Sequence, residues 1–306
     1  MLFSEPKNRY HSEYETEVLL MKIYDVLNEG NVTFSMEVFP PKKASAFEQV
    51  KKTAETIATL RPDFISVTYG AGGTTIGATS ELARALQTET GVCVLPHLTC
   101  VTADRATVDQ LIAFYEAHGI ENILALRGDL PEGGRLSEDF CHADDLIRYI
   151  KAKTDLCIGG ACYPEGHPES RNKIEDMRYL KQKVDAGCDF LTTQMFFDND
   201  IFYNFLYRAR DAGIRVPIIA GIMPITDPRM LKRSIQLSAT NVPERFRAIV
   251  DHYGDHPDAM KQAGIIYASQ QIVDLIANGV KHIHLYTMNK PDVAAGIMRN
   301  ITELLK

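Results

Sequence analysis

The sequence predicts an α/β protein whose residues 1–306 form a single (β/α)8 barrel, with extra helices after the seventh strand. Short apolar runs alternate along the chain with longer amphipathic stretches, which is typical of parallel strands covered on both faces by helices. Several amphipathic stretches end in glycine, the residue that commonly terminates a helix. No G-x-G-x-x-G pattern opens a helix after the first expected strand, which makes a doubly wound sheet the less favoured alternative.

Eight apolar runs are the expected strands. Each run is almost continuously apolar, as a strand buried on both faces of a sheet must be. In chain order they lie at residues 33–39, 64–70, 92–100, 122–129, 156–164, 190–197, 216–224 and 282–289. Eight strands that are each followed by a helix close into a barrel, whose active site lies at the carboxyl ends of the strands.

The stretches between these runs have helical periodicity. Residues 46–60 and 107–120 repeat apolar side chains at positions i, i+3, i+4 and i+7. Residues from about 227 to 278 contain more helix than one βα unit needs, and we interpret the excess as an insertion and not as a second domain. Residues 1–30 are predicted to form an N-terminal helical extension. Four of the expected helices end at a glycine, namely Gly119, Gly187, Gly213 and Gly279.

Composition and charge exclude several classes of function. The formal net charge is -7, and Lys and Arg are scattered without a basic stripe, so the charge pattern gives no indication of nucleic-acid binding. No apolar run reaches the roughly 20 residues that a membrane helix needs, so no membrane association is expected. Residues 1–17 lack the basic and apolar segments of a signal peptide, so we expect a cytoplasmic protein.

The six cysteines are expected to be buried, reduced thiols. None of them forms a C-x-x-C pair, and their spacing does not resemble that of a zinc site, so no bound metal is expected. Reduced thiols agree with a cytoplasmic location, where disulfides are rare. The six are Cys93, Cys100, Cys141, Cys157, Cys162 and Cys188.

Polar side chains stand at the carboxyl end of nearly every expected strand. Such groups are costly inside apolar strands unless they are paired, and this end of a barrel is where active sites lie. The set comprises Glu37, Thr68, Tyr69, His97, Arg127, Asp129, Tyr163, Gln194, Tyr286 and Asn289. Its repetition from strand to strand predicts an enzyme.

Single members of the set leave structural alternatives open. His97 is consistent with a core histidine, and Arg127 with Asp129 is consistent with an internal ion pair. Glu37 is the most specific member, because its apolar neighbours should remove water from the carboxyl group, raise its pKa and suit it to general acid catalysis. The alternative for Glu37 is a surface glutamate on an edge strand.

Two further patterns favour structural roles. Residues 70–77, GAGGTTIG, lack the Lys-Ser/Thr ending of a phosphate-binding loop and are interpreted as a flexible βα loop. His282 and His284 share one strand face, but no carboxylate stands beside them at the spacing of metal ligands, so both are interpreted as structural.

Eight motifs, in their order and spacing, closely resemble the methylenetetrahydrofolate reductase family in its bacterial form, which is a catalytic barrel without a regulatory domain. They span about residues 30–290 and read FSMEVFPPK, ISVTYGAGG, PHLTC, ALRGDLP, YPEGHPE, LKQKVDAG, TQMFFD and YTMN. The resemblance implies an oxidoreductase of one-carbon metabolism and methionine biosynthesis. It would reduce 5,10-methylenetetrahydrofolate to 5-methyltetrahydrofolate with NADH or NADPH, by a ping-pong sequence through a bound FAD.

The resemblance also implies which side chains bind the flavin. Arg127 and Lys183 would bind the pyrophosphate, which accepts charge-assisted hydrogen bonds. Asp129 would lie near the flavin ring, where a negative charge disfavours an anionic reduced flavin and tunes the reduction potential. The full set is Thr68, His97, Arg127, Gly128, Asp129, Ala161, Tyr163, His167, Asp176 and Lys183.

Substrate contacts follow from the same resemblance. Glu37 would be the acid that helps to protonate the folate and open its methylene bridge to an iminium ion. Gln194 and Tyr286 would contact the folate and the nicotinamide, and Lys290 would also bind substrate.

The sequence departs from the family pattern at two places. The family has a substrate-packing phenylalanine on the helix after the seventh strand, and the nearest counterpart here is Ser234. The loop after the RGDLP motif is longer than usual, so the sequence leaves open whether Phe140 or His142 covers the flavin. Neither departure affects the acid or the flavin motifs.

Three alternatives remain at the level of the sequence. The same barrel serves in some members of the family as the flavoprotein subunit of a larger complex, which receives electrons from an accessory redox subunit. A metal-dependent lyase or hydrolase would use Glu37, His97 and Asp129 as ligands. A binding protein without activity would leave the polar strand ends unexplained. The choice between NADH and NADPH, a homo-oligomeric state and the physiological direction of the reaction stay open.

Overall fold

The computed structural model describes residues 21–69, 76–129, 137–238 and 240–306. Eight parallel strands form a closed barrel in which each strand pairs with the next and β8 returns to β1. The strands are β1 (Thr33–Val38), β2 (Ile65–Val67), β3 (Val94–Thr99), β4 (Asn122–Leu126), β5 (Cys157–Cys162), β6 (Phe190–Thr193), β7 (Ile218–Ile222) and β8 (His282–Tyr286). The (β/α)8 fold predicted from the sequence is confirmed, with each strand inside its predicted run.

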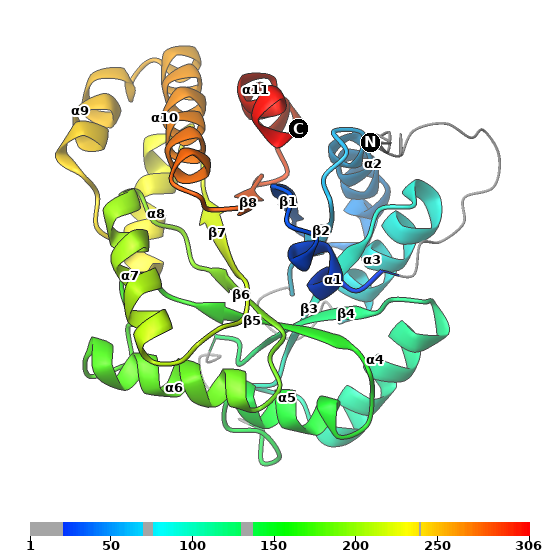
Figure 1. The fold of residues 1–306 in the computed structure, drawn as a ribbon. Helices are drawn as coiled ribbons and strands as arrows, with labels where there is room; N and C mark the ends of the chain where they lie inside the picture. Colours follow the sequence, from blue (N-terminus) through cyan, green and yellow to red (C-terminus); the bar gives the residue numbers. More distant parts are fainter. Residues whose placement is uncertain (1–20, 70–75, 130–136, 239) are drawn as a thin grey trace, which may run out of the picture.

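Helices surround the ring of strands (Figure 1). They are α1 (Ile23–Asn28), α2 (Phe47–Ala58), α3 (Ile76–Thr90), α4 (Arg105–Ala117), α5 (Ala143–Lys151), α6 (Lys173–Asp185), α7 (Asn199–Asp211), α8 (Pro228–Ser238), α9 (Glu244–Tyr253), α10 (Pro257–Ala277) and α11 (Pro291–Ile301), with short 3-10 turns η1 (Ala44–Ala46) and η2 (Thr302–Leu305). Three helices, α8, α9 and α10, separate β7 from β8, which confirms the predicted extra helices at this position.

The predicted helix ends are confirmed by the backbone. A glycine with positive φ follows a helix at each of the four predicted positions, where a side chain would be strained. These are Gly119 (φ 67), Gly187 (φ 112), Gly213 (φ 77) and Gly279 (φ 84). The glycine signal therefore locates the helix ends before any packing is known.

Helix α1 closes the amino-terminal end of the barrel. Ile23 and Leu27 pack there against Phe64 and other apolar side chains from the barrel interior. Asn122 fixes the helix, because its side-chain oxygen accepts from the Ile23 backbone N–H at 2.8 Å and its amide donates to the Met21 carbonyl at 2.9 Å. In Figure 1 this short helix lies across the centre of the ring. Part of the predicted N-terminal extension, residues 1–20, lies outside the described residues.

The barrel interior changes from apolar to polar along its axis. Side chains two residues apart on a strand point to the same side, so each strand supplies interior positions in layers. On β3, Leu95 belongs to the apolar cluster under α1, and His97 is the next interior residue. Phe64, directly before β2, is followed in the same way by Ser66 of that strand. The polar layer therefore lies toward the carboxyl ends of the strands, as the sequence predicts.

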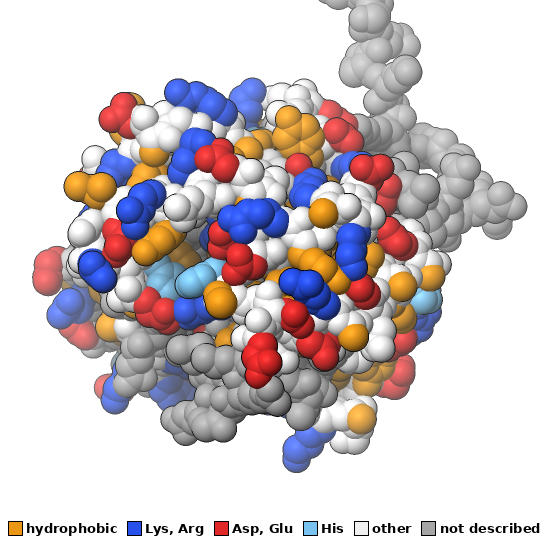
Figure 2. Space-filling model, turned by 90° about the horizontal axis from the view of Figure 1, so that it is seen from below, with side chains coloured by type: hydrophobic (Ala, Val, Ile, Leu, Met, Phe, Trp, Pro, Cys, Tyr) orange, Lys and Arg blue, Asp and Glu red, His pale blue; other side chains and the backbone are white. Residues whose placement is uncertain are grey.

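The surface agrees with the scattered charge of the sequence. Figure 2 shows the face formed by α4, α5 and α6, where acidic and basic side chains are interspersed. Among the described residues, no helix is long and apolar enough to span a membrane. Five of the six cysteines are buried and all six are free thiols, but Cys141 is exposed, contrary to the prediction for that residue.

Candidate active site

Glu37 is the centre of the polar layer in the barrel. It lies on β1 as a residue that is 6% exposed, and the strand register places it beside Ser66 of β2 and Tyr286 of β8. The Ser66 hydroxyl donates to the Glu37 Oε2 at 3.4 Å. His97 Nε2 lies 3.6 Å from the same oxygen. The alternative of a surface glutamate on an edge strand is therefore wrong, because a closed barrel has no edge and this carboxyl group faces its interior.

His284 joins the same group, although we predicted a structural role for it. Its Nε2 lies 3.7 Å from Glu37 Oε2 and 3.4 Å from the Ser66 hydroxyl. Its Nδ1 lies 2.8 Å from the hydroxyl of Ser35, which is also buried. The side chains of Ser35, Glu37, Ser66 and His284 thus form one hydrogen-bonding network. The sequence offered only alternation as a signal, since Ser35 and Glu37 share one face of β1.

Residues after β8 bind the backbone of Glu37 and of Phe39, which follows β1. The hydroxyl of Thr287 donates to the Glu37 carbonyl at 2.5 Å. Asn289 binds Phe39 twice, because its Oδ1 accepts from the backbone N–H at 2.8 Å and its Nδ2 donates to the carbonyl at 3.0 Å. Met288 and Asn289 adopt positive φ (54 and 53), a strained conformation for residues with side chains that clusters at functional sites. The hydrogen bonds from Thr287 and Asn289 therefore fix the position of the backbone from which the Glu37 side chain extends.

His97 is neutral in the folded protein near pH 7. Burial lowers its pKa from 6.5 to about 4, an effect that outweighs the opposing influence of Glu37. Its Nε2 has no hydrogen-bond partner among the described residues. A buried polar atom without a partner is rare in proteins, and it leaves a hydrogen-bonding capacity beside the carboxyl group.

The low pKa of His97 predicts acid sensitivity. The folded protein binds a proton on His97 more weakly than the unfolded chain does, so protonation favours unfolding. The free energy of unfolding therefore falls as the pH drops from 6.5 toward 4. At 1.36 kcal/mol per unit, this loss is about 3 kcal/mol. We expect His97→Gln to lose correspondingly less stability over this range than the wild type. Urea unfolding at pH 7 and pH 4.5 measures the difference, and parallel losses in both proteins would contradict it.

The predicted substrate residues line the same end of the barrel. The Tyr286 hydroxyl donates to the Thr193 carbonyl at 2.6 Å, and burial raises its pKa well above 10, so the hydroxyl keeps its proton in this bond. Gln194 is half-buried and its Oε1 accepts from the Met195 backbone N–H at 2.9 Å. Lys290 donates to the Thr226 hydroxyl at 2.9 Å. The contacts of Gln194, Tyr286 and Lys290 with substrate remain predictions.

Arg127 and Gly128 form a second group at the end of β4. The two terminal nitrogens of Arg127 donate to the two carboxylate oxygens of Glu169 at 2.6 and 2.7 Å, so its ion pair is with Glu169 and not with Asp129 as the sequence suggested. Asp129 is exposed. Gly128 has φ 90, and a Cβ there would lie 2.9 Å from the Thr99 Cβ. The chain therefore passes close to β3 at a point where only glycine fits.

The loop between β5 and α6 carries the next predicted residues. Tyr163 packs edge-on against His167 with ring centres 4.7 Å apart, and burial raises the Tyr163 pKa to about 12. Asp176 accepts from the His167 backbone N–H at 3.1 Å and from the Ser170 hydroxyl at 3.1 Å, so it holds this loop. Lys183 donates to the carbonyl of Ala161 on β5 at 2.6 Å. Asp176 and Lys183 thus have structural contacts beside their predicted roles toward the flavin.

Thr68 and the residues that depart from the family pattern are placed as follows. Thr68 is buried after β2, where its carbonyl accepts from the Thr79 hydroxyl at 3.0 Å. Phe140 is buried in the core against Tyr149, with ring centres 5.3 Å apart. His142 is exposed at the start of α5. Ser234 is buried within α8, where its hydroxyl donates to the Met230 carbonyl at 2.9 Å. Residues 70–75 of the GAGGTTIG segment lie outside the described residues.

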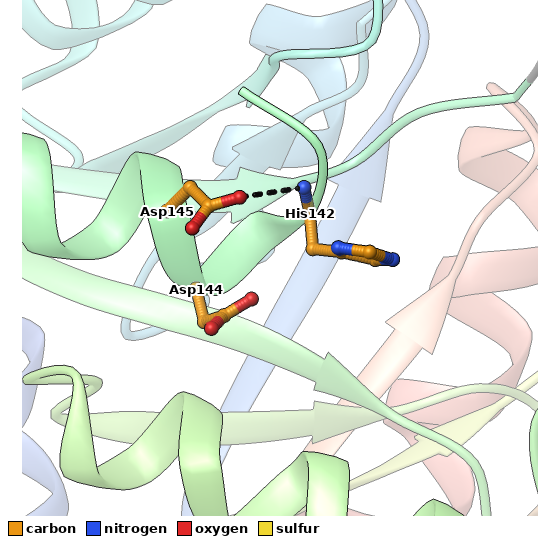
Figure 3. A group of neighbouring side chains, drawn as sticks. All are labelled: His142, Asp144 and Asp145. Carbon is orange, nitrogen blue, oxygen red and sulfur yellow. Dashed lines mark hydrogen bonds between the residues drawn. The ribbon is translucent and has the colours of Figure 1, made fainter. Parts of the chain in front are cut away.

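The predicted metal ligands are not brought together. Glu37 and His97 are neighbours, but Asp129 is exposed. Within the described ranges, the compact group of metal-ligand type is His142, Asp144 and Asp145, whose ligand atoms lie within 4.8 Å of one another (Figure 3). Asp145 accepts from the His142 backbone N–H at 3.1 Å, as the figure shows, and Arg148 pairs with both carboxylates. This group therefore caps α5.

Comparison with known proteins identifies the family. The family profile described as methylenetetrahydrofolate reductase matches residues 22–302. A relative from Oryza sativa subsp. japonica, named probable methylenetetrahydrofolate reductase (NADH), is 35% identical over 92% of this chain and 50% of its own length. The chain thus spans about half the length of such plant relatives. The 5,10-methylenetetrahydrofolate reductase of Escherichia coli (strain K12) is 33% identical over 89% of this chain and 92% of its own.

A solved structure shows the same fold at lower identity. It is described as an uncharacterized protein from Clostridium thermocellum that binds two copies of 5-methyl-5,6,7,8-tetrahydrofolic acid, and it matches with a TM-score of 0.61 at 15% identity. The match covers 93% of this chain and 99% of that chain. Because the identity is only 15%, it supports the fold alone. The family profile and the bacterial relatives extend over almost the whole barrel, including both polar groups at its carboxyl end. On these grounds the chain belongs to the methylenetetrahydrofolate reductase family.

Proposed function

We propose that this protein reduces 5,10-methylenetetrahydrofolate to 5-methyltetrahydrofolate, with a reduced nicotinamide as the hydride donor and FAD as the bound cofactor. The observation that carries the proposal is the buried carboxyl group of Glu37, which lies in a serine–histidine network at the end of the barrel where such enzymes react. Family membership supports the same activity.

The residues at the end of β4 fit a flavin dinucleotide. Arg127 presents both terminal nitrogens in the planar geometry that suits a phosphate as well as a carboxylate. Gly128 has no side chain, so the main chain next to Arg127 can lie close to Thr99, where a Cβ would be only 2.9 Å from the Thr99 Cβ. We infer that Arg127, His167 and Lys183 lie along the phosphates and that Asp129 lies toward the ring.

When bound at Arg127, His167 and Lys183, FAD would supply the hydride-transfer chemistry that links the nicotinamide to the folate. The protein supplies the proton that the folate needs before hydride transfer. We infer that Glu37 is the proton donor, because its buried carboxyl group lies at the centre of the polar layer, next to His97, which stays neutral near pH 7. The hydroxyl of Ser66 and the ring of His284 orient the carboxyl group.

The visible spectrum of the purified chain tests this proposal. We expect a flavin spectrum that bleaches when NADH is added without oxygen and recovers when methylenetetrahydrofolate follows. A flavin that ignores both NADH and NADPH would indicate a subunit that receives electrons from a partner. A colourless chain that takes up no FAD would overturn the proposal.

A further inference from the structure

Arg127 is already paired with an anion of the protein itself. Its ion pair with Glu169 is bidentate, with N–O distances of 2.6 and 2.7 Å, and it joins the end of β4 to the loop between β5 and α6. Each terminal nitrogen of the guanidinium donates to a different carboxylate oxygen. This is also the arrangement by which arginine binds two oxygens of a phosphate. Glu169 therefore uses the face of Arg127 that an anionic ligand would need.

The two partners differ in how firmly they are held. The Arg127 side chain is 24% exposed, whereas that of Glu169 is 54% exposed. Arg127 also donates from its Nε to the Gly128 carbonyl at 3.3 Å, which keeps the guanidinium near the strand end. Glu169 lies on a loop, and an exposed carboxylate that loses its partner is readily hydrated, so breaking such a pair costs little. The glutamate can thus leave while the arginine stays in place.

The surroundings of Glu169 favour an anion. Its pKa is lowered chiefly by the hydrogen bonds from Arg127, and the charge of Arg127 acts in the same direction. His167 is adjacent, since its Nδ1 accepts from the Glu169 backbone N–H at 3.2 Å. The guanidinium of Arg127, at the end of another strand, is therefore the positive group that holds a carboxylate at this position.

We propose that Glu169 is an internal substitute for a cofactor phosphate: it occupies Arg127 when the cofactor is absent, and it must be displaced for FAD to bind. This inference rests on the proposed function for the identity of the ligand. Glu169 then sets the affinity for the phosphate-bearing part of the flavin, and it lowers that affinity by competing for the same guanidinium. Its exposed position leaves it free to turn into solvent once the phosphates have taken its place.

The alternative is that Glu169 orients Arg127 and stays bound to it beside the cofactor. The two readings predict opposite effects of Glu169→Gln. Removing a competitor strengthens cofactor binding, whereas removing an orienting partner weakens it. The variant keeps the size of the side chain. Because Glu169 is exposed, we expect the variant to fold, and its thermal melting temperature checks this.

The experiment titrates the full-length, flavin-free chain with FAD and, separately, with inorganic pyrophosphate. We expect Glu169→Gln to bind both about three- to ten-fold more tightly than the wild type, a range expected for loss of one partly exposed, charge-assisted pair. Asp185→Asn is the matched control, because it removes an exposed carboxylate paired with Lys181 at the far end of α6. Its dissociation constants should equal those of the wild type.

A double-mutant cycle with Arg127→Gln makes the test specific. In that background Glu169→Gln should change neither dissociation constant, since no guanidinium is left to compete for. Equal or weaker binding by Glu169→Gln alone would overturn the displacement. A wild-type chain that binds no FAD would overturn the proposed function, while the pyrophosphate titrations would still decide whether Glu169 competes for an anion site.

Discussion

Glu37→Gln is expected to lower the rate of folate reduction by about 100- to 10,000-fold, the contribution typical of a positioned general acid. Glutamine keeps the shape of the side chain and can still accept from the Ser66 hydroxyl, but it cannot deliver a proton. Reduction of the flavin by the nicotinamide needs no such proton and should proceed at the wild-type rate. Stopped-flow absorbance measures the two half-reactions separately, under anaerobic conditions.

The control for this variant is Glu165→Gln. Glu165 is a half-buried carboxylate after β5 that accepts a hydrogen bond from the Asn241 backbone N–H at 2.9 Å. The side-chain oxygen of glutamine can accept the same hydrogen bond. Both half-reactions should therefore survive in the control. If Glu37→Gln slowed the two half-reactions equally, Glu37 would have a structural role and the assignment of the acid would be wrong.

Gly264→Ala is expected to destabilise the protein by about 2–4 kcal/mol, although alanine is usually the better residue inside a helix. Gly264 lies in α10, where a Cβ would overlap the Ile225 carbonyl oxygen and lie 2.8 Å from its carbon. The obstacle is backbone, so it cannot rotate away as a side chain would. The next residue, Thr226, accepts a hydrogen bond from Lys290, and any shift of this loop moves a predicted substrate contact.

Urea unfolding measures this effect, with Gly77→Ala as the control. Gly77 also lies in a helix, α3, but a Cβ there would meet no atom of the described residues within 4 Å. The control should be as stable as the wild type or slightly more stable. A stable Gly264→Ala protein would show that α10 can move away from β7 without cost.

The fold was predictable because its signal is repeated. Each βα unit carries an apolar strand and an amphipathic helix, and four glycines with positive φ mark helix ends that the sequence already indicated. Strand lengths were less accurate: of the described residues 64–69 in the predicted run 64–70, three form the strand, Ile65–Val67. Apolar character continues past the end of a strand because the residues that leave the barrel are also buried.

The residues of the candidate site were predictable only where a single charged side chain stood out in its apolar surroundings. Glu37 is conspicuous in an apolar strand, and Arg127 stands at the end of another. Ser35 and His284 are 249 positions apart, and only closure of the barrel brings them together. Serine is common in strands, so Ser35 and Ser66 gave no signal. Glu169 was missed for a similar reason, since a glutamate in a polar loop is unremarkable until its partner is known.

The contact of Thr287 and Asn289 with β1 makes the position of Glu37 depend on the end of the chain. β1 is the first strand to be synthesised and β8 the last, and the two meet at the seam of the barrel. A chain still emerging from the ribosome can pair β1 with β2, which carries Ser66, but it lacks the contacts that β8 and the residues after it make with the first strand. The backbone at Glu37 gains these contacts only when the eighth strand docks, so that a polypeptide truncated before residue 282 lacks both the seam and the bonds from Thr287 and Asn289.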